Sequence, residues 1–272
     1  MRYMEIPIRA EGSGDLVKLE TYLLDTPTEK IMIKKRPMIL ICPGGGYERL
    51  SYREGEPVAI RFLNQGYHAC VLRYSVAPVR HPAQLFEIAG AMKLIRDNAA
   101  DWQVDTEKII LTGFSAGAHL AASLGVFWNR ERLCETLHVT AQELKPAGMI
   151  LCYPVITSKK GLSHEGSFEN LLGERFSELS EELSIEKQVT KDTPPCFIWH
   201  TLDDATVPVE NSFLMVSALK RAGVPAELHV FPKGEHGLSL AGKTVERADG
   251  SGLNGQCEQW MGLALTWLRM IL

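Results

Sequence analysis

The sequence predicts an α/β fold with a mostly parallel central sheet and helices on both faces. Short, continuous apolar runs alternate along the chain with longer helix-forming stretches, which is the pattern of parallel strands joined by crossover helices. The chain has 272 residues, of which 45% are hydrophobic and 23% charged. This is average globular composition, and the length is enough to bury one sizeable core. We therefore expect a single domain spanning residues 1–272.

The first expected strand lies within residues 4–24, where apolar and polar residues alternate from Val17 to Leu23. This alternation is typical of a half-exposed antiparallel edge strand. Six later runs are unbroken and predict strands buried on both faces; they cover residues 38–42, 69–72, 109–111, 149–152, 196–199 and 228–231. Helix-forming stretches follow at 56–65, 82–99, 116–128, 208–221 and 256–270.

The connection between the runs at 149–152 and 196–199 is too long for a simple crossover. Residues 157–193 are polar and partly helix-forming, and a structureless loop of that length inside a compact domain is unusual. We expect a small cap inserted over the functional face of the sheet, with a solvated surface excursion as the alternative. A second loop, residues 238–255, is rich in glycine and polar residues and is expected to leave the same edge.

Composition excludes several classes of partner. The formal net charge is −4 and no basic stripe is present, so neither nucleic acid nor a membrane is expected as a partner. The start lacks the apolar core of a signal peptide, which predicts a cytoplasmic protein. The six cysteines lack metal-type spacing, and four of them fall in expected central strands as buried free thiols: Cys42, Cys70, Cys152 and Cys196. Whether the chain forms a homo-oligomer is left open.

The segment Gly113–Gly117 has the form Gly-x-Ser-x-Gly between an expected buried strand and an expected small-residue helix. In this context the pattern is a nucleophile elbow, a turn so tight that side chains at its flanking positions would collide. Such a turn lifts the Ser115 hydroxyl to the top of the sheet. Ser115 is therefore the candidate nucleophile.

A serine hydroxyl needs a base to take its proton and an acid to orient that base. His236 is the candidate base, because it lies between glycines directly after the last expected strand. Asp203 and Asp204 both follow the strand at 196–199, and either could be the acid.

The negative oxygen of a tetrahedral intermediate needs backbone N–H donors already in place. The amide of Ala116, next after the nucleophile, is one candidate. The loop Pro43–Tyr47 contains three successive glycines, which let the main chain turn its N–H groups inward. A phosphate-binding loop is the competing interpretation, but no Gly-Lys-Ser/Thr follows the glycines.

Together these segments resemble the α/β-hydrolase superfamily over essentially the whole chain. The resemblance rests on Pro43–Tyr47, Gly113–Gly117, Asp204–Pro208 and His236–Gly237, in that order. It implies Asp204 as the acid, by register with His-Gly-x-x-Asp-x-x-Val-Pro, although Thr201 stands where the family usually has glycine. It also implies Gly45 and Gly46 as oxyanion donors. More narrowly, Arg53–Pro57 and Thr193–Pro195 are similar to small bacterial acetyl-xylan esterase and lipase/esterase-like proteins.

The resemblance implies ester hydrolysis through an acyl-enzyme, without a metal or organic cofactor. We expect a serine esterase for short, chiefly acetyl, esters, such as those of acetylated sugars or xylo-oligosaccharides. A small polar cap and Tyr47, directly after the glycines, both favour a confined acyl pocket. A serine peptidase of the same fold and a non-catalytic binding protein are the alternatives, but intact candidates for nucleophile, base and acid argue against the second.

Five residues are candidates to contact the substrate: Tyr47, Tyr74, His81, Phe114 and Phe168. Two other histidines are expected to have structural roles. His119, four residues after Ser115 on the same helix face, should pack or hydrogen-bond beneath the elbow. His200, at the end of a buried strand, should be a satisfied core group or a neighbour of the catalytic residues.

Overall fold

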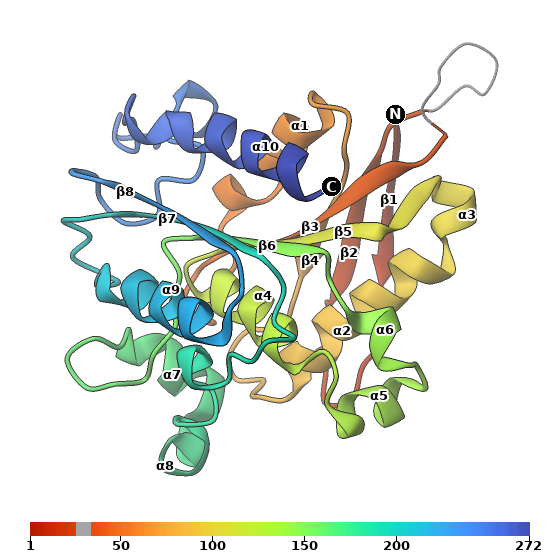
Figure 1. The fold of residues 1–272 in the computed structure, drawn as a ribbon, viewed down its shortest axis with the longest axis horizontal. Coiled ribbons are helices and arrows are strands. Elements are labelled where there is room, and N and C mark those ends of the chain that lie inside the picture. Colours follow the sequence, from red (N-terminus) through yellow and green to blue (C-terminus); the bar gives the residue numbers. More distant parts are fainter. Residues whose placement is uncertain (26–33) are drawn as a thin grey trace.

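The computed structural model describes residues 1–25 and 34–272. Within them, eight strands form one sheet in the order β1-β2-β4-β3-β5-β6-β7-β8 (Figure 1). The strands are β1 (Arg2–Pro7), β2 (Lys18–Leu23), β3 (Arg36–Cys42), β4 (His68–Arg73), β5 (Val104–Phe114), β6 (Gly148–Cys152), β7 (Cys196–Thr201) and β8 (Ala226–Phe231). From β4 to β8, each neighbouring pair is parallel. The predicted α/β fold with a mostly parallel sheet is confirmed.

The two edges of the sheet differ from the prediction. β2 is antiparallel, as expected, but β1 pairs with it from outside, so β2 is not the edge and only Lys18 in it stays partly exposed. β1 has an alternating exposed pattern and was not foreseen. The expected fully buried strand at 228–231 is β8, which among the described strands pairs only with β7 and is the other, half-exposed edge. The burial of β2 and β8 thus depends on their positions in the sheet, which the apolar runs alone did not predict.

Helices cover both faces of the sheet (Figure 1). One face carries α1 and α10, and the other carries α2, α4 and α9. Their bounds are α1 (Glu56–Leu63), α2 (Ala83–Asp97), α4 (Ala116–Phe127), α9 (Glu210–Ala222) and α10 (Trp260–Ile271). All five were expected. The short helices α3 (Ala99–Trp102), α5 (Glu131–Leu137) and α6 (Ala141–Leu144) were not.

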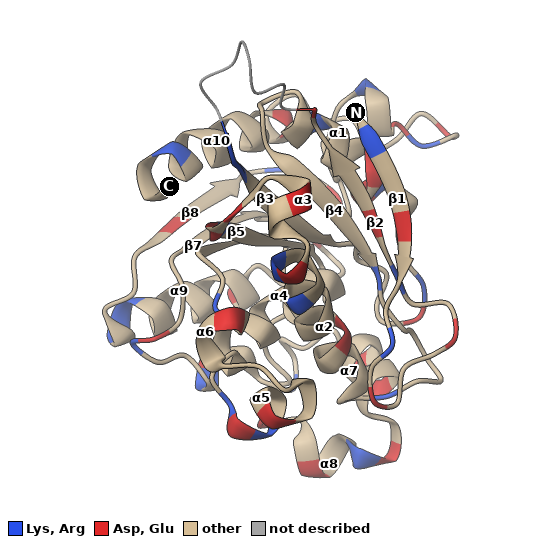
Figure 2. Cartoon of the chain, turned by 90° about the vertical axis from the view of Figure 1, so that its right-hand side faces the viewer, with Lys and Arg blue, Asp and Glu red and all other residues tan. Residues whose placement is uncertain are grey.

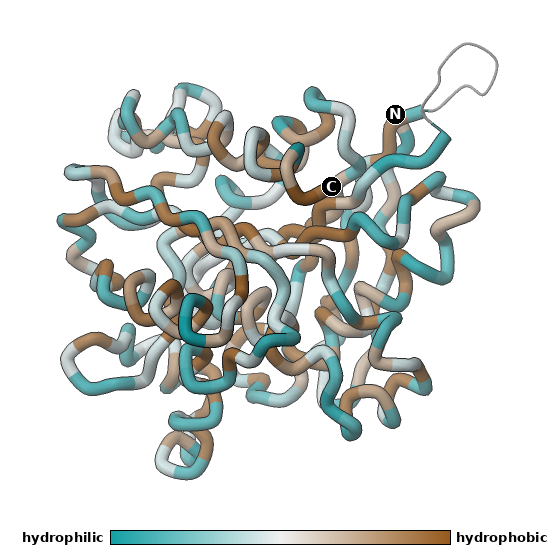
Figure 3. Tube along the Cα trace, in the orientation of Figure 1, coloured by the Kyte–Doolittle hydropathy of each residue, from teal (hydrophilic) through white to brown (hydrophobic). Residues whose placement is uncertain are grey.

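The core consists of two apolar clusters separated by the sheet. Along β3, Met38 and Leu40 belong to the cluster under α2 and α4, whereas Ile39 and Ile41 belong to the cluster under α1 and α10. This two-residue alternation is the pleat of a strand buried on both faces. In Figure 3 the brown, hydrophobic colour is concentrated where the strands cross the middle of the molecule.

The long insertion at 157–193 is folded. It contains α7 (Glu165–Leu172) and α8 (Phe176–Leu179), which lie beyond the layer of α4 and α9 (Figure 1). Its ends and middle are attached to the body: the Ile185 N–H donates to the Ile156 carbonyl at 2.9 Å, and the His81 N–H donates to the Leu171 carbonyl at 2.9 Å. The insertion is therefore an ordered layer of the domain.

The cysteines, the surface charges and the length of the helices also bear on the sequence predictions. The four cysteines expected in central strands are buried free thiols. In Figure 2, acidic and basic residues are interspersed along the helices and loops of the face shown. No helix among the described residues has both the length and the apolar character needed to cross a membrane.

The tight packing at the elbow predicts a large cost for adding a methyl group at Gly117. A Cβ at Gly117 would lie 2.2 Å from the Cys42 carbonyl oxygen and 2.3 Å from that of Pro43. Gly117→Ala should lower the free energy of unfolding by about 1–3 kcal/mol, because backbone atoms must move. The measurement is urea unfolding followed by circular dichroism.

Gly262→Ala is the matched control, because Gly262 lies in α10 with no atom within 4 Å of its added Cβ. Alanine favours helix, so this variant should be stabilised by up to about 1 kcal/mol. Equal unfolding free energies for the two variants would contradict the packing argument.

Candidate active site

Ser115 occupies the sharp turn between β5 and α4. Its backbone is at φ 52° and ψ −119°, a conformation that non-glycine residues rarely adopt. A Cβ at Gly113 would lie 2.4 Å from the Gly117 carbonyl oxygen, so both flanking glycines are sterically required. The Ser115 N–H donates to the Cys152 carbonyl at 3.0 Å, which attaches the turn to β6. The local geometry is that of the expected elbow.

The structure brings Ser115, His236 and Asp204 into one hydrogen-bonded chain. His236 Nε2 lies 2.8 Å from Ser115 Oγ, and His236 Nδ1 lies 2.7 Å from Asp204 Oδ2. All three follow the carboxyl ends of strands, namely β5, β7 and β8. Because parallel strands end at one edge of the sheet, residues far apart in sequence meet there. The Asp204 side chain is fully buried, while that of His236 is 16% exposed.

Asp204 is held as a carboxylate. Burial alone would raise its pKa, but hydrogen bonds from His200 and His236 and from the Val207 N–H outweigh burial and hold the pKa well below its usual range. His200 is fully buried, and its Nε2 lies 3.3 Å from Asp204 Oδ2. The expectation that His200 is a buried group beside the catalytic residues is confirmed.

The neighbouring Asp203 points elsewhere. Its Oδ1 accepts a hydrogen bond from the Gly234 N–H at 2.7 Å in an exposed position. Asp203 therefore stabilises the start of the loop that contains His236. Geometry separates the two aspartates that the sequence left as alternatives: Asp204, and not Asp203, contacts the imidazole.

The glycine loop after β3 lies directly against the elbow. A Cβ at Gly44 would be 3.0 Å from Ser115 Cβ. Gly45 and Gly46 both have positive φ, at 131° and 67°, as expected of a main chain that turns its N–H groups inward. Within the described part of the chain, the N–H groups of Gly45, Gly46 and Ala116 donate to no acceptor. These three N–H groups therefore have no competing acceptor there.

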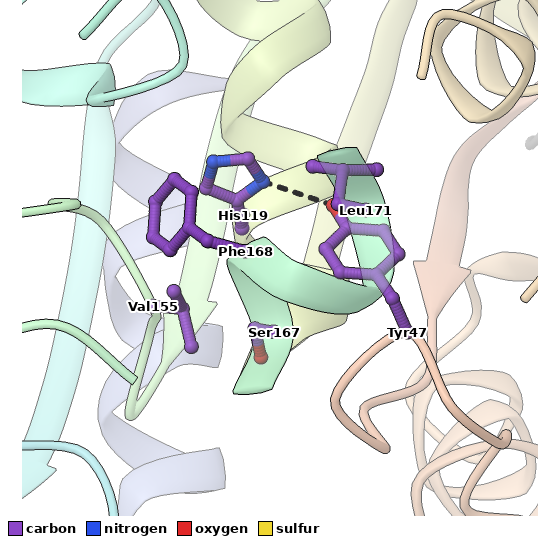
Figure 4. Close-up of a pocket in the computed structure, with 6 residues that line it drawn as sticks. All are labelled: Tyr47, His119, Val155, Ser167, Phe168 and Leu171. Carbon is purple, nitrogen blue, oxygen red and sulfur yellow. Dashed lines mark hydrogen bonds between the residues drawn. The ribbon is translucent and has the colours of Figure 1, made fainter. Parts of the chain in front are cut away.

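A narrow apolar pocket lies beside the elbow (Figure 4). Its lining residues are Tyr47, His119, Val155, Ser167, Phe168 and Leu171. About 120 Å³ of space lies between these side chains, but none of it is wide enough for a water molecule, so it is a gap in the packing. The Val155 N–H donates to the Ser115 carbonyl at 3.2 Å, which connects the pocket to the nucleophile turn. Two of the five residues expected to contact the substrate, Tyr47 and Phe168, are therefore in this pocket.

The other three expected substrate contacts lie elsewhere. Tyr74 is buried behind Tyr47 and donates its hydroxyl hydrogen to the Pro43 carbonyl at 2.6 Å. His81 is partly buried, and its main chain binds α7. Phe114 is fully buried on the opposite face of the sheet, against Trp260 and Tyr153, and does not line the pocket.

His119 crosses beneath the elbow as expected. Its Nε2 donates to the Leu183 carbonyl at 2.8 Å, so its Nδ1 must accept the Tyr47 hydroxyl hydrogen at 2.9 Å (Figure 4). Burial lowers the pKa of His119 to about 4. The neutral imidazole thus connects the glycine loop to the insertion.

Several residues near the site were missed by the sequence analysis. The insertion places His164 and Ser167 just outside Gly46, where an added Cβ would lie 3.8 Å and 3.9 Å from their side chains. Asn170 donates to the Gly46 carbonyl at 3.0 Å. Glu54 accepts the Gly44 N–H at 2.9 Å. The segment Arg53–Pro57 was singled out by resemblance, but no pattern in it indicated this contact.

The fold and the geometry of the site define an α/β-hydrolase. The family model BD-FAE matches residues 24–219, and the chain belongs to the BD-FAE family. Residues 1–25 and 34–272 contain no group of three or more His, Cys, Asp or Glu side chains that could hold a metal ion.

Two curated relatives have names that refer to xylan. The chain is 41% identical over 216 residues to endo-1,4-beta-xylanase B of Butyrivibrio fibrisolvens, covering 76% of this chain and 33% of that protein. It is 30% identical over 204 residues to the acetylxylan esterase of Xylanibacter ruminicola, covering 73% and 40% of the two chains. The chain thus spans only a third to two fifths of the length of these relatives.

Solved structures resemble the chain over its whole length. An acetyl ester-xyloside bifunctional hydrolase from Caldicellulosiruptor lactoaceticus has a TM-score of 0.83 and 36% identity, covering 99% of this chain and 97% of that one. The carboxylesterase Cest-2923 from Lactobacillus plantarum has a TM-score of 0.86 and 29% identity, covering 99% and 98%. Both of these solved structures are named as ester hydrolases.

The buried neutral His119 predicts a loss of stability in mild acid. The folded pKa of His119, about 4, lies below the ordinary histidine value of 6.5, so the unfolded state binds the extra proton and stability falls as the pH drops from about 6.5 toward 4. Between pH 7 and pH 5 this one histidine should account for about 2 kcal/mol of lost unfolding free energy.

The measurement is urea unfolding at pH 7 and pH 5 for the wild type and for His119→Asn. His68 and His81 also have pKa values lowered to about 4 by burial, and they remain in both proteins. Between pH 7 and pH 5, His119→Asn should lose about 2 kcal/mol less unfolding free energy than the wild type loses. An identical loss in the two proteins would show that His119 is not held neutral.

Proposed function

We propose that the protein is a serine esterase that removes short acyl groups, chiefly acetyl, from sugar hydroxyls such as those of xylo-oligosaccharides. The observation that supports it most is the chain of two hydrogen bonds, 2.8 Å and 2.7 Å long, that joins Ser115 to His236 and His236 to Asp204. This is the arrangement by which a serine hydroxyl becomes a nucleophile at neutral pH.

The residues divide the reaction into two halves. In the first, Ser115 Oγ attacks the ester carbonyl carbon while His236 Nε2 takes the hydroxyl proton. Asp204 stabilises the imidazolium, and the free N–H groups of Gly45, Gly46 and Ala116 stabilise the oxygen that becomes negative. His236 then gives its proton to the departing alcohol, which leaves an acyl-Ser115. In the second half a water molecule, deprotonated by His236, attacks that ester and releases the acid.

The size and polarity of the surroundings support a small acyl group on a polar alcohol. The gap between Tyr47, His119 and Phe168 admits no group as wide as a water molecule, so a long acyl chain cannot enter there, and the shortest acyl groups need the least space beside Ser115. The insertion contributes polar groups on this side. His164 Nδ1 and Ser167 Oγ are hydrogen-bonded at 2.7 Å, and both side chains lie beside Gly46. We assign the insertion the role of a cap that contacts the alcohol part. The names of the similar acetylxylan esterase and acetyl ester-xyloside hydrolase agree with this substrate class.

The two adjacent aspartates give a direct test of the mechanism. Asp204→Asn should lower kcat on p-nitrophenyl acetate by about 10⁴-fold, because an amide cannot stabilise the imidazolium and favours the wrong tautomer of His236. Asp203→Asn should cost about ten-fold or less, since it loses only a loop contact. Steady-state kinetics on both folded variants measures the difference, and the reverse ranking would reject Asp204 as the acid.

The substrate proposal predicts a preference for the shortest esters. The value of kcat/KM should be highest for two to four carbons, on the order of 10-fold above that for longer chains, because each extra methylene must enter a pocket without room for it. The measurement covers p-nitrophenyl esters of about two to twelve carbons and acetate release from acetylated xylo-oligosaccharides.

Acetylated and deacetylated xylo-oligosaccharides form the matched pair, since only the first can release acetate. A maximum at about eight carbons or more, with no acetate released from the sugars, would overturn the substrate class while leaving the serine mechanism intact.

A further inference from the structure

The carboxylate of Glu54 is buried next to the catalytic chain but takes no part in it. Glu54 ends a short 3-10 helix, Tyr52–Glu54, that connects the glycine loop to α1. Its side chain is only 3% exposed. A buried anion destabilises a protein unless hydrogen-bond donors surround it. Both of its oxygens have such donors, and these come from opposite sides of the active site.

One oxygen binds the glycine loop. Glu54 Oε2 accepts the Gly44 N–H at 2.9 Å, and the Gly44 carbonyl in turn accepts the Ser51 N–H at 2.9 Å. The segment 51–54 therefore fixes the peptide groups on both sides of Gly44. A Cβ at Gly44 would be 2.8 Å from Glu54 Oε2 and 3.0 Å from Ser115 Cβ. The carboxylate thus lies at the base of the loop whose next two N–H groups are the free donors.

The other oxygen binds the side of the site that contains the base. Glu54 Oε1 accepts the Tyr153 hydroxyl hydrogen at 2.6 Å, and the same hydroxyl oxygen accepts the Ser239 N–H at 2.9 Å. Ser239 is three residues after His236. The Tyr153 ring also meets the His236 ring edge-on, with centroids 5.1 Å apart and an interplanar angle of 71°. Tyr153 therefore contacts both the imidazole and the loop that follows it.

Arg53, the residue before Glu54, also attaches the loop after His236 to this segment. Arg53 donates from Nη1 to the Gly237 carbonyl at 2.7 Å and from Nε to the Val245 carbonyl at 2.6 Å. The Ser239 hydroxyl donates to the Arg53 carbonyl at 2.5 Å. The loop after His236 is therefore attached to the 53–54 segment at several points, and Glu54 is the residue that also reaches the glycine loop.

We propose that Glu54 is a positioning residue that, through Gly44 and Tyr153, sets the distance between the oxyanion donors and the imidazole of His236. The proposal rests on the serine esterase mechanism above and adds a residue that mechanism does not use. Hydrogen bonds to a buried carboxylate are short and strong, so they fix position better than apolar packing would. A shift of about 1 Å between donor loop and base is enough to slow the reaction about 100-fold.

The test compares Glu54→Gln, Tyr153→Phe and the double variant. A glutamine can keep its one acceptor oxygen for the Gly44 N–H, but its amide nitrogen then faces the Tyr153 hydroxyl as a donor, so the Tyr153 hydroxyl hydrogen loses its acceptor. Tyr153→Phe keeps the ring against His236 and removes only the hydroxyl. Glu87→Gln is the matched control, because Glu87 is a fully buried carboxylate that accepts from Ser75 N at 2.8 Å and Ser75 Oγ at 2.6 Å.

Four quantities are measured on the wild type and the variants. They are Tm and, well below the lowest Tm, kcat and KM for p-nitrophenyl acetate and the rate of Ser115 labelling by an organophosphonate. Glu54→Gln and Tyr153→Phe should each lower kcat and the labelling rate by about 10- to 100-fold, with KM changed by less than about three-fold. The double variant should lose less than the product of the two, because both act through one connection.

The control separates positioning from stability. Glu87→Gln should lower Tm by a similar amount and keep kcat within about two-fold of wild type. Folded Tyr153→Phe and Glu54→Gln with kcat within about two-fold of wild type would overturn the proposal, as would an equal kcat loss in Glu87→Gln. If Glu54→Gln does not fold, Tyr153→Phe decides alone. A wild type that neither hydrolyses the ester nor labels at Ser115 would instead refute the serine esterase mechanism itself.

Discussion

The left-handed turn at Ser115 is the constraint on which the rest of the site depends. A non-glycine residue at φ 52° costs of order 1–3 kcal/mol and persists only where the surroundings fix it. Here the surroundings are backbone, because Gly117 lies directly on the carbonyls of Cys42 and Pro43. The same contact therefore shapes the turn and brings the glycine loop against the nucleophile. The backbone strain is therefore located at Ser115, the residue whose hydroxyl oxygen must project away from α4.

Buried polar groups then fix the remaining parts at the carboxyl edge of the sheet. Asp204 and Glu54 are both buried carboxylates, and each binds donors from more than one loop. His119 serves the same purpose as a neutral group between Tyr47 and the insertion. When one partner is missing, such a buried hydrogen-bond network destabilises the folded state more than apolar packing would. When complete, it specifies one arrangement of the side chains. A site of this kind is rigid.

The sequence predicted what depends on local pattern and missed what depends on long-range packing. Unbroken apolar runs identified the central strands, and the Gly-x-Ser-x-Gly spacing located Ser115 because the turn itself requires those glycines. The edges were misplaced, since burial of β2 and β8 depends on which strands pair with them. Phe114 was expected near the substrate, yet it shares a strand face with Ile110, on the side of α10. The contact of Glu54 with Tyr153 joins residues 99 apart in sequence, and no spacing rule predicts it.

The central claim is that Ser115 is an activated nucleophile, and active-site titration tests it most directly. The protein is incubated with an organophosphonate, and the adduct is located by peptide mass spectrometry. The account predicts one phosphonyl group per chain, on Ser115, with loss of esterase activity in step with labelling and no label on Ser115→Ala. Labelling on another residue, or full esterase activity in a protein whose Ser115 is completely labelled, would contradict it.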